Sequence, residues 1–219
     1  MKEKFIDILY DKNTNKYSVP YNPAQDKDAE KWRRLDSTTD SSEIFKVGIL
    51  DSGMMYHHPL LKDVIVDGID FTGEGLEDQN GHGTMVTLIM VTNVKSPIYI
   101  YNIKVMDKHL RCCEDYLLNG LIWAEEHKIN LLNISLGMPK KEKCTTDSCR
   151  VCRQIEKMVH QSNTIIVAAA GNDKKHVYCP ACSDHVISVG ALNASGDAIA
   201  DYSNKADFYG IGTFFFREL

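Results

Sequence analysis

The sequence has no long hydrophobic run, little glycine or proline, and no excess of basic residues. Its 219 residues include 14 Gly and six Pro, too few for a collagen-like or low-complexity chain. A hydrophobic content of 43% also argues against a wholly disordered chain. The 25 Lys and Arg are outnumbered by 30 Asp and Glu, giving a net charge of −5. We therefore predict a globular protein with no nucleic-acid partner.

No apolar stretch is long enough to span a bilayer, so we predict no membrane partner. The N-terminus is charged throughout and lacks the apolar core of a secretory signal. We therefore expect a cytoplasmic protein, whose seven cysteines stay reduced rather than form a disulfide framework. Nothing in the sequence indicates an oligomeric state.

The beginning of the chain differs in composition from the rest. Residues 1–46 contain nine basic and nine acidic residues and show little apolar periodicity. We predict that residues 1–41 form a charged arm that is partly disordered or lies on the surface, with a short helix around Asp28–Leu35. Residues 42–219 are predicted to form the main domain.

Short apolar runs alternate with helical patterns in this domain. The runs are rich in Val and Ile and have the length of strands: Val47–Leu50, Val64–Val66, Ile98–Val105, Asn130–Leu136, Thr164–Ala170 and Val186–Ala191. Helical periodicity occurs at His82–Asn93, Asp115–Lys128 and Arg150–Ser162. This alternation predicts an α/β fold, a three-layer sandwich with a mostly parallel central sheet.

Three features of the helices follow from the same patterns. The first helix is apolar nearly all round, which predicts that it is buried. In the second, Asp115 is a candidate N-cap, and Leu121 and Ile122 belong to the apolar stripe. In the third, Val151, Ile155, Met158 and Val159 form the apolar stripe.

Four motifs contain residue types that often take part in catalysis, and each follows a predicted strand or begins a predicted helix. They are Asp51-Ser52-Gly53, Asn80-Gly81-His82-Gly83-Thr84, Ser135-Leu136-Gly137 and Gly171-Asn172. In a parallel sheet, such groups gather beyond the carboxyl ends of the strands. A carboxylate there can hold an imidazole in one tautomer, and an amide can donate to a developing oxyanion.

Each motif alone has a plain structural explanation. Asp51 and Asn172 could be turn or capping residues, and His82 could simply begin a helix. Each motif nevertheless falls at the end of its own element, in a fixed order along the chain. Together they indicate a catalytic site.

The motifs also carry a family resemblance from Val47 to Asn204. The segments at 47–53, 78–84, 133–137 and 168–172 resemble the Asp, His, substrate-binding and oxyanion motifs of the subtilisin-like serine proteases, or subtilases. The resemblance implies a subtilisin-like fold that needs no cofactor and acts on peptide or protein substrates.

The resemblance implies peptide-bond hydrolysis by an Asp–His–Ser triad in that chain order. Asp51 would orient His82, and His82 would act as general base and acid. Asn172 would donate to the oxyanion. The substrate would pair as an added strand with three consecutive residues, Ser135, Leu136 and Gly137.

The nucleophile of this family is not identifiable in the sequence. Subtilases place it in a Gly-Thr-Ser-Met-Ala-type segment that opens a long helix. Here Asp207–Gly212 resembles the element that precedes this segment, Phe214 follows Gly212-Thr213, and neither Ser183 nor Ser203 is a substitute. We therefore expect the C-terminal part of the domain to be missing, with apolar faces left exposed.

Three explanations for the missing serine remain open at this point. They are a truncated or frame-shifted product of a serine endopeptidase gene, a catalytically inactive peptide-binding pseudoenzyme, and a protein completed by another chain.

Two cysteine pairs have metal-ligand spacing. Cys149-x-x-Cys152 and Cys179-x-x-Cys182 are compatible with a structural zinc site of four thiolates, with Cys144 as a spare ligand. Buried thiols are the alternative, and the family resemblance does not imply zinc. In the arm, Ser18-Val19-Pro20-Tyr21 weakly resembles a segment that lies across the cleft of intracellular subtilases, although an ordinary solvated arm is the simpler interpretation.

Overall fold

The computed structural model describes residues 8–11, 16–18, 44–94, 96–139, 144, 147–212 and 216–218, which form two compact units. The smaller unit contains β1 (Ile8–Asp11), β2 (Lys16–Ser18) and β10 (Phe216–Glu218), with β1 parallel to β10 and antiparallel to β2. The sequence pattern does not predict these strands. The expected helix at Asp28–Leu35 lies outside the described residues, as does the segment that follows Ser18.

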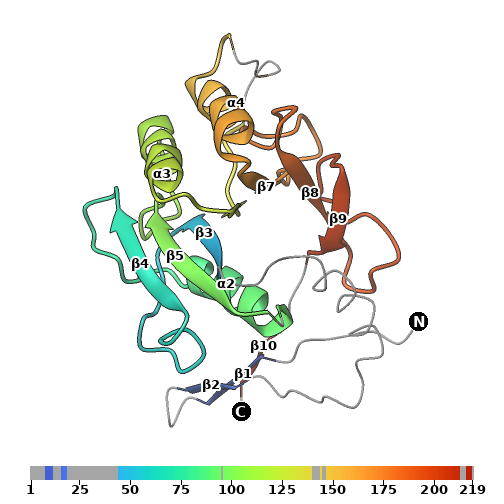
Figure 1. The fold of residues 1–219 in the computed structure, drawn as a ribbon. Coiled ribbons are helices and arrows are strands. Elements are labelled where there is room, and N and C mark those ends of the chain that lie inside the picture. Colours follow the sequence, from blue (N-terminus) through green and yellow to red (C-terminus); the bar gives the residue numbers. More distant parts are fainter. Residues whose placement is uncertain are drawn as a thin grey trace. The chain divides into compact units, whose positions relative to one another are not determined.

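The larger unit is built on a seven-stranded sheet (Figure 1). Its order is β4-β5-β3-β6-β7-β8-β9, and every neighbouring pair is parallel. The strands are β3 (Phe45–Asp51), β4 (Ile65–Asp70), β5 (Ile98–Lys104), β6 (Leu131–Ile134), β7 (Ile165–Ala169), β8 (Ile187–Leu192) and β9 (Phe208–Ile211). The helices are α2 (His82–Asn93), α3 (Glu114–Glu126) and α4 (Arg150–Ser162). The predicted α/β fold is confirmed, although β9 is not predicted and β4 is longer than its apolar run.

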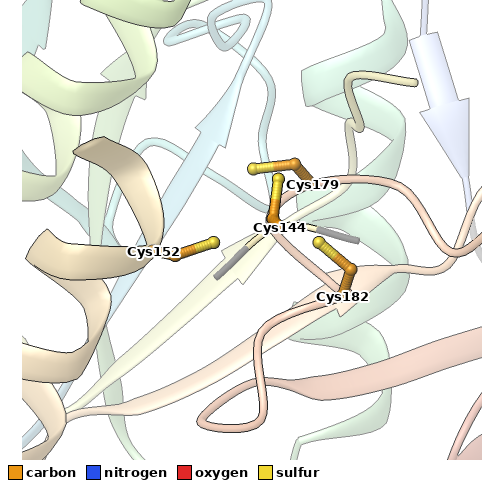
Figure 2. Close-up of side chains that lie close together, drawn as sticks. All are labelled: Cys144, Cys152, Cys179 and Cys182. Carbon is orange, nitrogen blue, oxygen red and sulfur yellow. The ribbon is translucent and has the colours of Figure 1, made fainter. Parts of the chain in front are cut away.

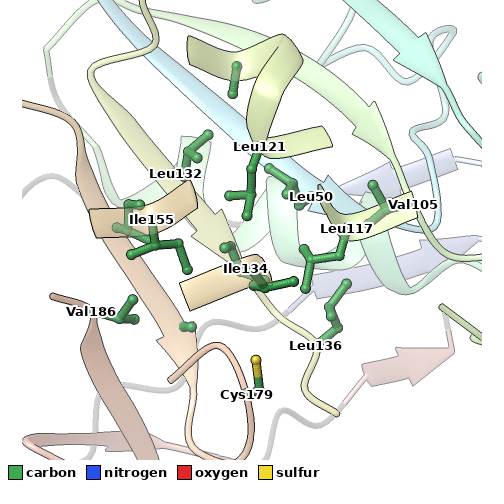
Figure 3. Packing of buried hydrophobic residues seen from close by; sticks show 14 of the residues in the cluster. Leu50, Val105, Leu117, Leu121, Leu132, Ile134, Leu136, Ile155, Cys179 and Val186 are labelled. Atoms are coloured by element: carbon green, nitrogen blue, oxygen red, sulfur yellow. The ribbon is translucent and has the colours of Figure 1, made fainter. Parts of the chain in front are cut away.

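Alternate side chains of the strands face two separate layers. On one face, Leu50 and Ile134 pack in a buried cluster with Leu121 of α3 and Ile155 of α4 (Figure 3). On the other face, Val47 belongs to a cluster against which α2 packs. Burial of each large aliphatic side chain stabilises the fold by roughly 1.5–3 kcal/mol. The sheet is therefore the middle layer of a sandwich.

The two helices on the first face differ in how well their stripes are predicted. In α4, the buried side chains include Val151, Ile155 and Met158, as expected. In α3, Leu121 is fully buried but Ile122 is 37% exposed, so its assignment to the apolar stripe is wrong. Successive helical residues are about 100° apart, which turns Ile122 out of the stripe that Leu121 occupies.

The predicted N-cap of α3 is also wrong. The helix begins at Glu114 with Cys113 as the capping residue, and no side chain caps it. Asp115 therefore lies within the first turn, where acidic residues favour the helix dipole. Its carboxylate accepts a 2.8 Å hydrogen bond from Arg150 at the start of α4.

The face that α2 covers is only partly shielded. Among the apolar residues of α2, Leu88 alone is buried, so the prediction of an all-round buried helix is wrong. By strand register, Ile165, Ile187 and Phe208 lie on the same face as Val47. They are 46%, 39% and 63% exposed. Nothing in the described residues covers this face well over β7, β8 and β9.

The amino and carboxyl ends of the parallel strands have different roles. At the amino ends of β6 and β7, Lys128 and Asn163 turn the chain from helix to strand, each with a φ of 52°. The carboxyl ends lead into the segments with the candidate site residues. In the described part of the chain, no helix combines the length and apolarity needed to cross a bilayer.

Candidate active site

Asp51 is the last residue of β3 and is almost completely buried, with 1% of its surface exposed. One carboxylate oxygen, Oδ1, accepts a 2.7 Å hydrogen bond from the backbone N–H of Ser52. The other, Oδ2, is buried and has no hydrogen-bond partner among the described residues. Burial raises the pKa of the Asp51 carboxyl because its charged form has lost contact with water.

His82 is the first residue of α2, and its ring faces Asp51. Its Nδ1 lies 2.7 Å from Oδ1 of Asp51, and 38% of its side chain is exposed. The hydrogen bond that His82 donates to Asp51 raises the pKa of His82, and partial burial opposes the shift. Because a carboxylate can only accept, Nδ1 donates and Nε2 is the ring atom left to take or give a proton. The predicted pair is therefore brought together in the geometry of a general base.

A carboxylate that sequence reasoning did not single out holds the start of α2 in place. Asp78 Oδ1 accepts hydrogen bonds from the Ser52 hydroxyl at 3.0 Å and from the N–H groups of Asn80 and Gly81 at 3.0 and 2.8 Å. Its Oδ2 accepts from the N–H and hydroxyl of Thr84 at 2.9 and 2.7 Å. Asp78 thus binds the His82 turn to the end of β3. The position of Asp78, three residues before the N-cap of α2, was the sequence signal that could have indicated this role.

The sheet order places the candidate substrate segment next to this pair. β6 lies between β3 and β7, and Leu50 pairs with Ile134. Ser135–Gly137 therefore leaves the sheet beside Asp51, about 4.8 Å away in strand spacing. The backbone of Gly137 makes no hydrogen bond within the described part of the chain. It is available to pair with an added strand.

Asn172 follows β7 on the far side of β6, and it is exposed. The preceding Gly171 has a φ of 107°, a left-handed backbone conformation that residues other than glycine rarely adopt. Buried Asn204 ties down the loop: its amide donates to the Ala170 carbonyl at 3.1 Å and accepts from the Asp173 N–H at 3.2 Å. The sequence motifs give no indication of this role for Asn204.

One aromatic ring fits between the two glycines of these neighbouring segments. A side-chain carbon added at Gly137 would lie 2.8 Å from Cβ of Tyr178, and one added at Gly171 would lie 2.8 Å from Cγ of the same residue. Real side chains essentially never approach so closely, so both positions require glycine while Tyr178 is in place. Tyr178 therefore fixes the spacing between the substrate segment and the Asn172 turn.

The predicted cysteines lie beside these segments. Cys152, Cys179 and Cys182 form a group with Cys144, and all four sulfur atoms lie within 4.8 Å of one another (Figure 2). Cys149, predicted as a ligand in place of Cys144, lies outside this group, although its Sγ is 3.8 Å from that of Cys179. The structure thus brings together three of the four predicted ligands with the spare one.

Comparison with known proteins decides the family. The subtilase family model matches residues 43–210, about three quarters of the chain. The chain belongs to the subtilase family. The family predicted from the sequence is therefore confirmed.

Three similar relatives show how much of a subtilase the chain spans. It is 31% identical over 168 residues to a subtilase-type proteinase of Saccharomyces cerevisiae, which covers 71% of this chain and 33% of the relative. The chain is 31% identical to the intracellular serine protease of Paenibacillus polymyxa over 180 residues, which cover 73% of this chain and 53% of the relative. The chain is also 31% identical to subtilisin DY of Bacillus licheniformis over 182 residues, which cover 76% of this chain and 61% of the relative. The chain thus spans a third to three fifths of these relatives.

In the described part of this subtilase, no serine hydroxyl forms a hydrogen bond with His82. The Ser203 hydroxyl donates to the carbonyl of Asn204 at 2.9 Å and accepts from the Ala191 N–H at 2.8 Å. The Ser135 hydroxyl accepts from the side chain of Asn133 at 2.9 Å. These local bonds are structural and leave neither hydroxyl in the role of a nucleophile.

Proposed function

We propose that this chain supplies the acid–base part of a serine endopeptidase and binds its polypeptide substrate as an added strand. The observation that carries the proposal is the 2.7 Å contact between Asp51 and His82 at the carboxyl edge of the sheet. It supports a role for Nε2 of His82 in removing a proton from a nucleophile and returning it to the leaving amine. Asp51 holds the ring and stabilises its charged form.

Two further segments have roles beside the acid–base pair. The unpaired backbone of Gly137 supports strand-like binding of substrate along Ser135–Gly137. The exposed Asn172, on the next strand along, is suited to donate its amide to the oxyanion. Loss of one such donor typically raises the barrier by about 3–4 kcal/mol.

Hydrolysis by this mechanism needs a serine next to His82. We infer that it comes from a segment outside the described residues, which belongs to the same polypeptide or to another chain. The exposed side chains of Ile165, Ile187 and Phe208 support this inference, because a contiguous apolar face of this kind usually contacts another element. A helix on this face would complete the layer that α2 begins.

A second function, peptide binding without hydrolysis, is favoured by a different observation. Within the described residues, Gly137 is open to a substrate strand while no serine hydroxyl bonds to His82. A chain with only these features would bind extended peptides and leave them intact.

Labelling with a fluorophosphonate, which reacts with activated serines, tests the proposed function. The protein is isolated from its own cells, and the labelled peptide is identified by mass spectrometry. We expect a labelled serine outside the described residues and a labelling rate that His82→Ala lowers on the order of 10⁴-fold or more. A labelled serine among the described residues, or labelling that does not depend on His82, contradicts the proposal.

Hydrogen exchange separates the second function from the first. If the native protein is not labelled but an extended peptide slows amide exchange at Gly137, the chain is a binding protein. The matched control is β4 (Ile65–Asp70), an edge strand of the seven-stranded sheet, where exchange should not change. Slowing at both places would indicate general stabilisation rather than strand addition.

We also propose an intracellular location, supported by the name of the Paenibacillus polymyxa relative, an intracellular serine protease. The substrates are then peptides or unfolded proteins of the cell interior.

A further inference from the structure

Four thiols from three separate segments gather in the larger unit (Figure 2). Cys144 precedes α4, Cys152 lies in the first turn of α4, and Cys179 and Cys182 belong to the connection between β7 and β8. Every pair of their sulfur atoms is within 4.8 Å. Such mutual proximity is not needed to fill a core, because each thiol could pack against any apolar neighbour.

The spacing of the sulfur atoms suits a tetrahedral metal ion. Zinc binds thiolates at about 2.3 Å, so the sulfur atoms of a tetrahedral site lie about 3.8 Å apart. The observed upper limit of 4.8 Å requires each sulfur atom to move inward by less than the length of one covalent bond. Small rotations of the side chains would accomplish this.

The surroundings are those of a structural metal site rather than a catalytic one. Cys152 and Cys179 are 1% and 0% exposed, and Cys144 is 8% exposed. All three belong to the main apolar cluster, and Cys182 packs against it while remaining partly exposed. Apolar neighbours exclude water from the ion, and the partly exposed Cys182 gives a route of entry.

The local backbone already holds two of the thiols in place. The Cys182 N–H donates to the Tyr178 carbonyl at 2.9 Å, which closes a turn around the Cys179-x-x-Cys182 pair. Cys179 and Met138 exchange two backbone hydrogen bonds, of 2.7 and 3.0 Å. A turn that places two cysteines three residues apart is a common half of a four-thiolate site.

Cys149 explains why spacing alone suggests a different set. It has the expected two-residue spacing from Cys152, but it is the N-cap of α4 and has extended backbone angles. Its Sγ reaches that of Cys179 at 3.8 Å and yet lies outside the group of four. Cys144 takes the fourth position.

We propose that Cys144, Cys152, Cys179 and Cys182 bind one zinc ion that joins α4 to the connection between β7 and β8. Zinc replaces the protons of the thiols, and these protons are released to solvent. With four protein ligands the ion keeps no open position, so it acts on structure and not on a substrate. This assignment does not depend on the proposed peptidase function.

The position of the site indicates what the ion stabilises. Cys179 is adjacent to Tyr178, whose ring separates Gly137 from Gly171. Cys179 also pairs with Met138, the residue after the substrate segment. Zinc would therefore stabilise the segment around Tyr178, which separates Ser135–Gly137 from the Asn172 turn.

The full 219-residue chain, purified with reductant and exchanged against zinc, tests the proposal. We expect about one tightly held zinc ion per chain by elemental analysis. Cobalt substituted for zinc should give the intense visible and thiolate charge-transfer absorption of a tetrahedral sulfur site. An absence of metal in the reduced chain, a cobalt spectrum without sulfur ligation, or a disulfide among these cysteines in protein isolated under non-reducing conditions would overturn it.

Single substitutions identify the ligands. Cys144→Ser should lower zinc occupancy in competition with a chelator at least tenfold, whereas Cys149→Ser, its matched control, should leave the occupancy unchanged. If the two variants behave in the opposite way, the ligand set proposed here is wrong. Because Cys144→Ser could also impair folding, the cobalt spectrum of the unmodified chain is the independent readout.

A second group of candidate ligands needs a control of its own. Glu156, His160 and His185 also lie within 4.8 Å of one another, nearer the surface. The double variant His160→Ala/His185→Ala should retain one zinc ion and the same cobalt spectrum. Loss of zinc from this variant would assign the ion to the imidazoles and contradict the thiolate site.

Discussion

Replacing Asp78 by alanine should destabilise the larger unit by about 3–7 kcal/mol. The carboxylate accepts five hydrogen bonds at the start of α2. The N–H groups of Asn80 and Gly81 can turn to water, but the side chains of Ser52 and Thr84 are buried, at 0% and 3% exposure. Each buried polar group left unpaired costs about 1–3 kcal/mol, and loss of a helix cap adds about 1 kcal/mol.

Urea unfolding at neutral pH measures this change. The midpoint should fall in Asp78→Ala while the slope stays constant, since the slope reports the surface exposed on unfolding. Asp63→Ala, which removes an exposed carboxylate, is the control and should change stability by less than about 0.5 kcal/mol. If Asp78→Ala does not fold, Ser52→Ala gives a milder test of the same contacts. Equal effects of Asp78→Ala and Asp63→Ala would refute the reasoning.

Three other predictions concern the acid–base pair, the core and the Asn172 loop. Asp51→Asn should lower the pKa of His82 toward its ordinary value of 6.5, as measured by NMR titration. Because the folded pKa of His82 is raised, its proton stabilises the fold below pH 6.5, and this contribution is lost as the pH rises through the folded pKa. Urea unfolding across this range should show a smaller loss in Asp51→Asn, and an unchanged pH dependence would contradict the assignment. Leu121→Ala should cost about 2–5 kcal/mol of unfolding free energy, whereas Ile122→Ala, its partly exposed neighbour, should cost far less. Asn204→Ala should speed hydrogen exchange in the loop after β7, and unaltered exchange there would show that Asn204 does not hold it.

The layers of the fold and the acid–base pair could be predicted from the chain because their signals are local. Runs of Val and Ile mark the central strands, and the helices between them show their period in the sequence. Asp51 and His82 each lie at the end of such an element. Once the sheet is parallel, its topology brings those ends to one edge.

Other features depend on contacts that no local pattern encodes. The pairing of β1 with β10 joins residues from opposite ends of the chain. The place of Cys144 in the thiol group depends on the path of the chain before α4, so a spacing rule selects Cys149 instead. The five hydrogen bonds to Asp78 and the fit of Tyr178 between two glycines likewise appear only in three dimensions.

The turns at Lys128 and Asn163 have a practical use, because they lie a full strand length from the candidate active site. A fluorophore or an immobilising tether attached at either position would leave the opposite rim open to solution. Both backbones already adopt a conformation that glycine or asparagine tolerates best, so short inserts rich in these residues are suitable linkers. Sensors of the proposed peptide binding can therefore be built on this protein without altering Ser135–Gly137.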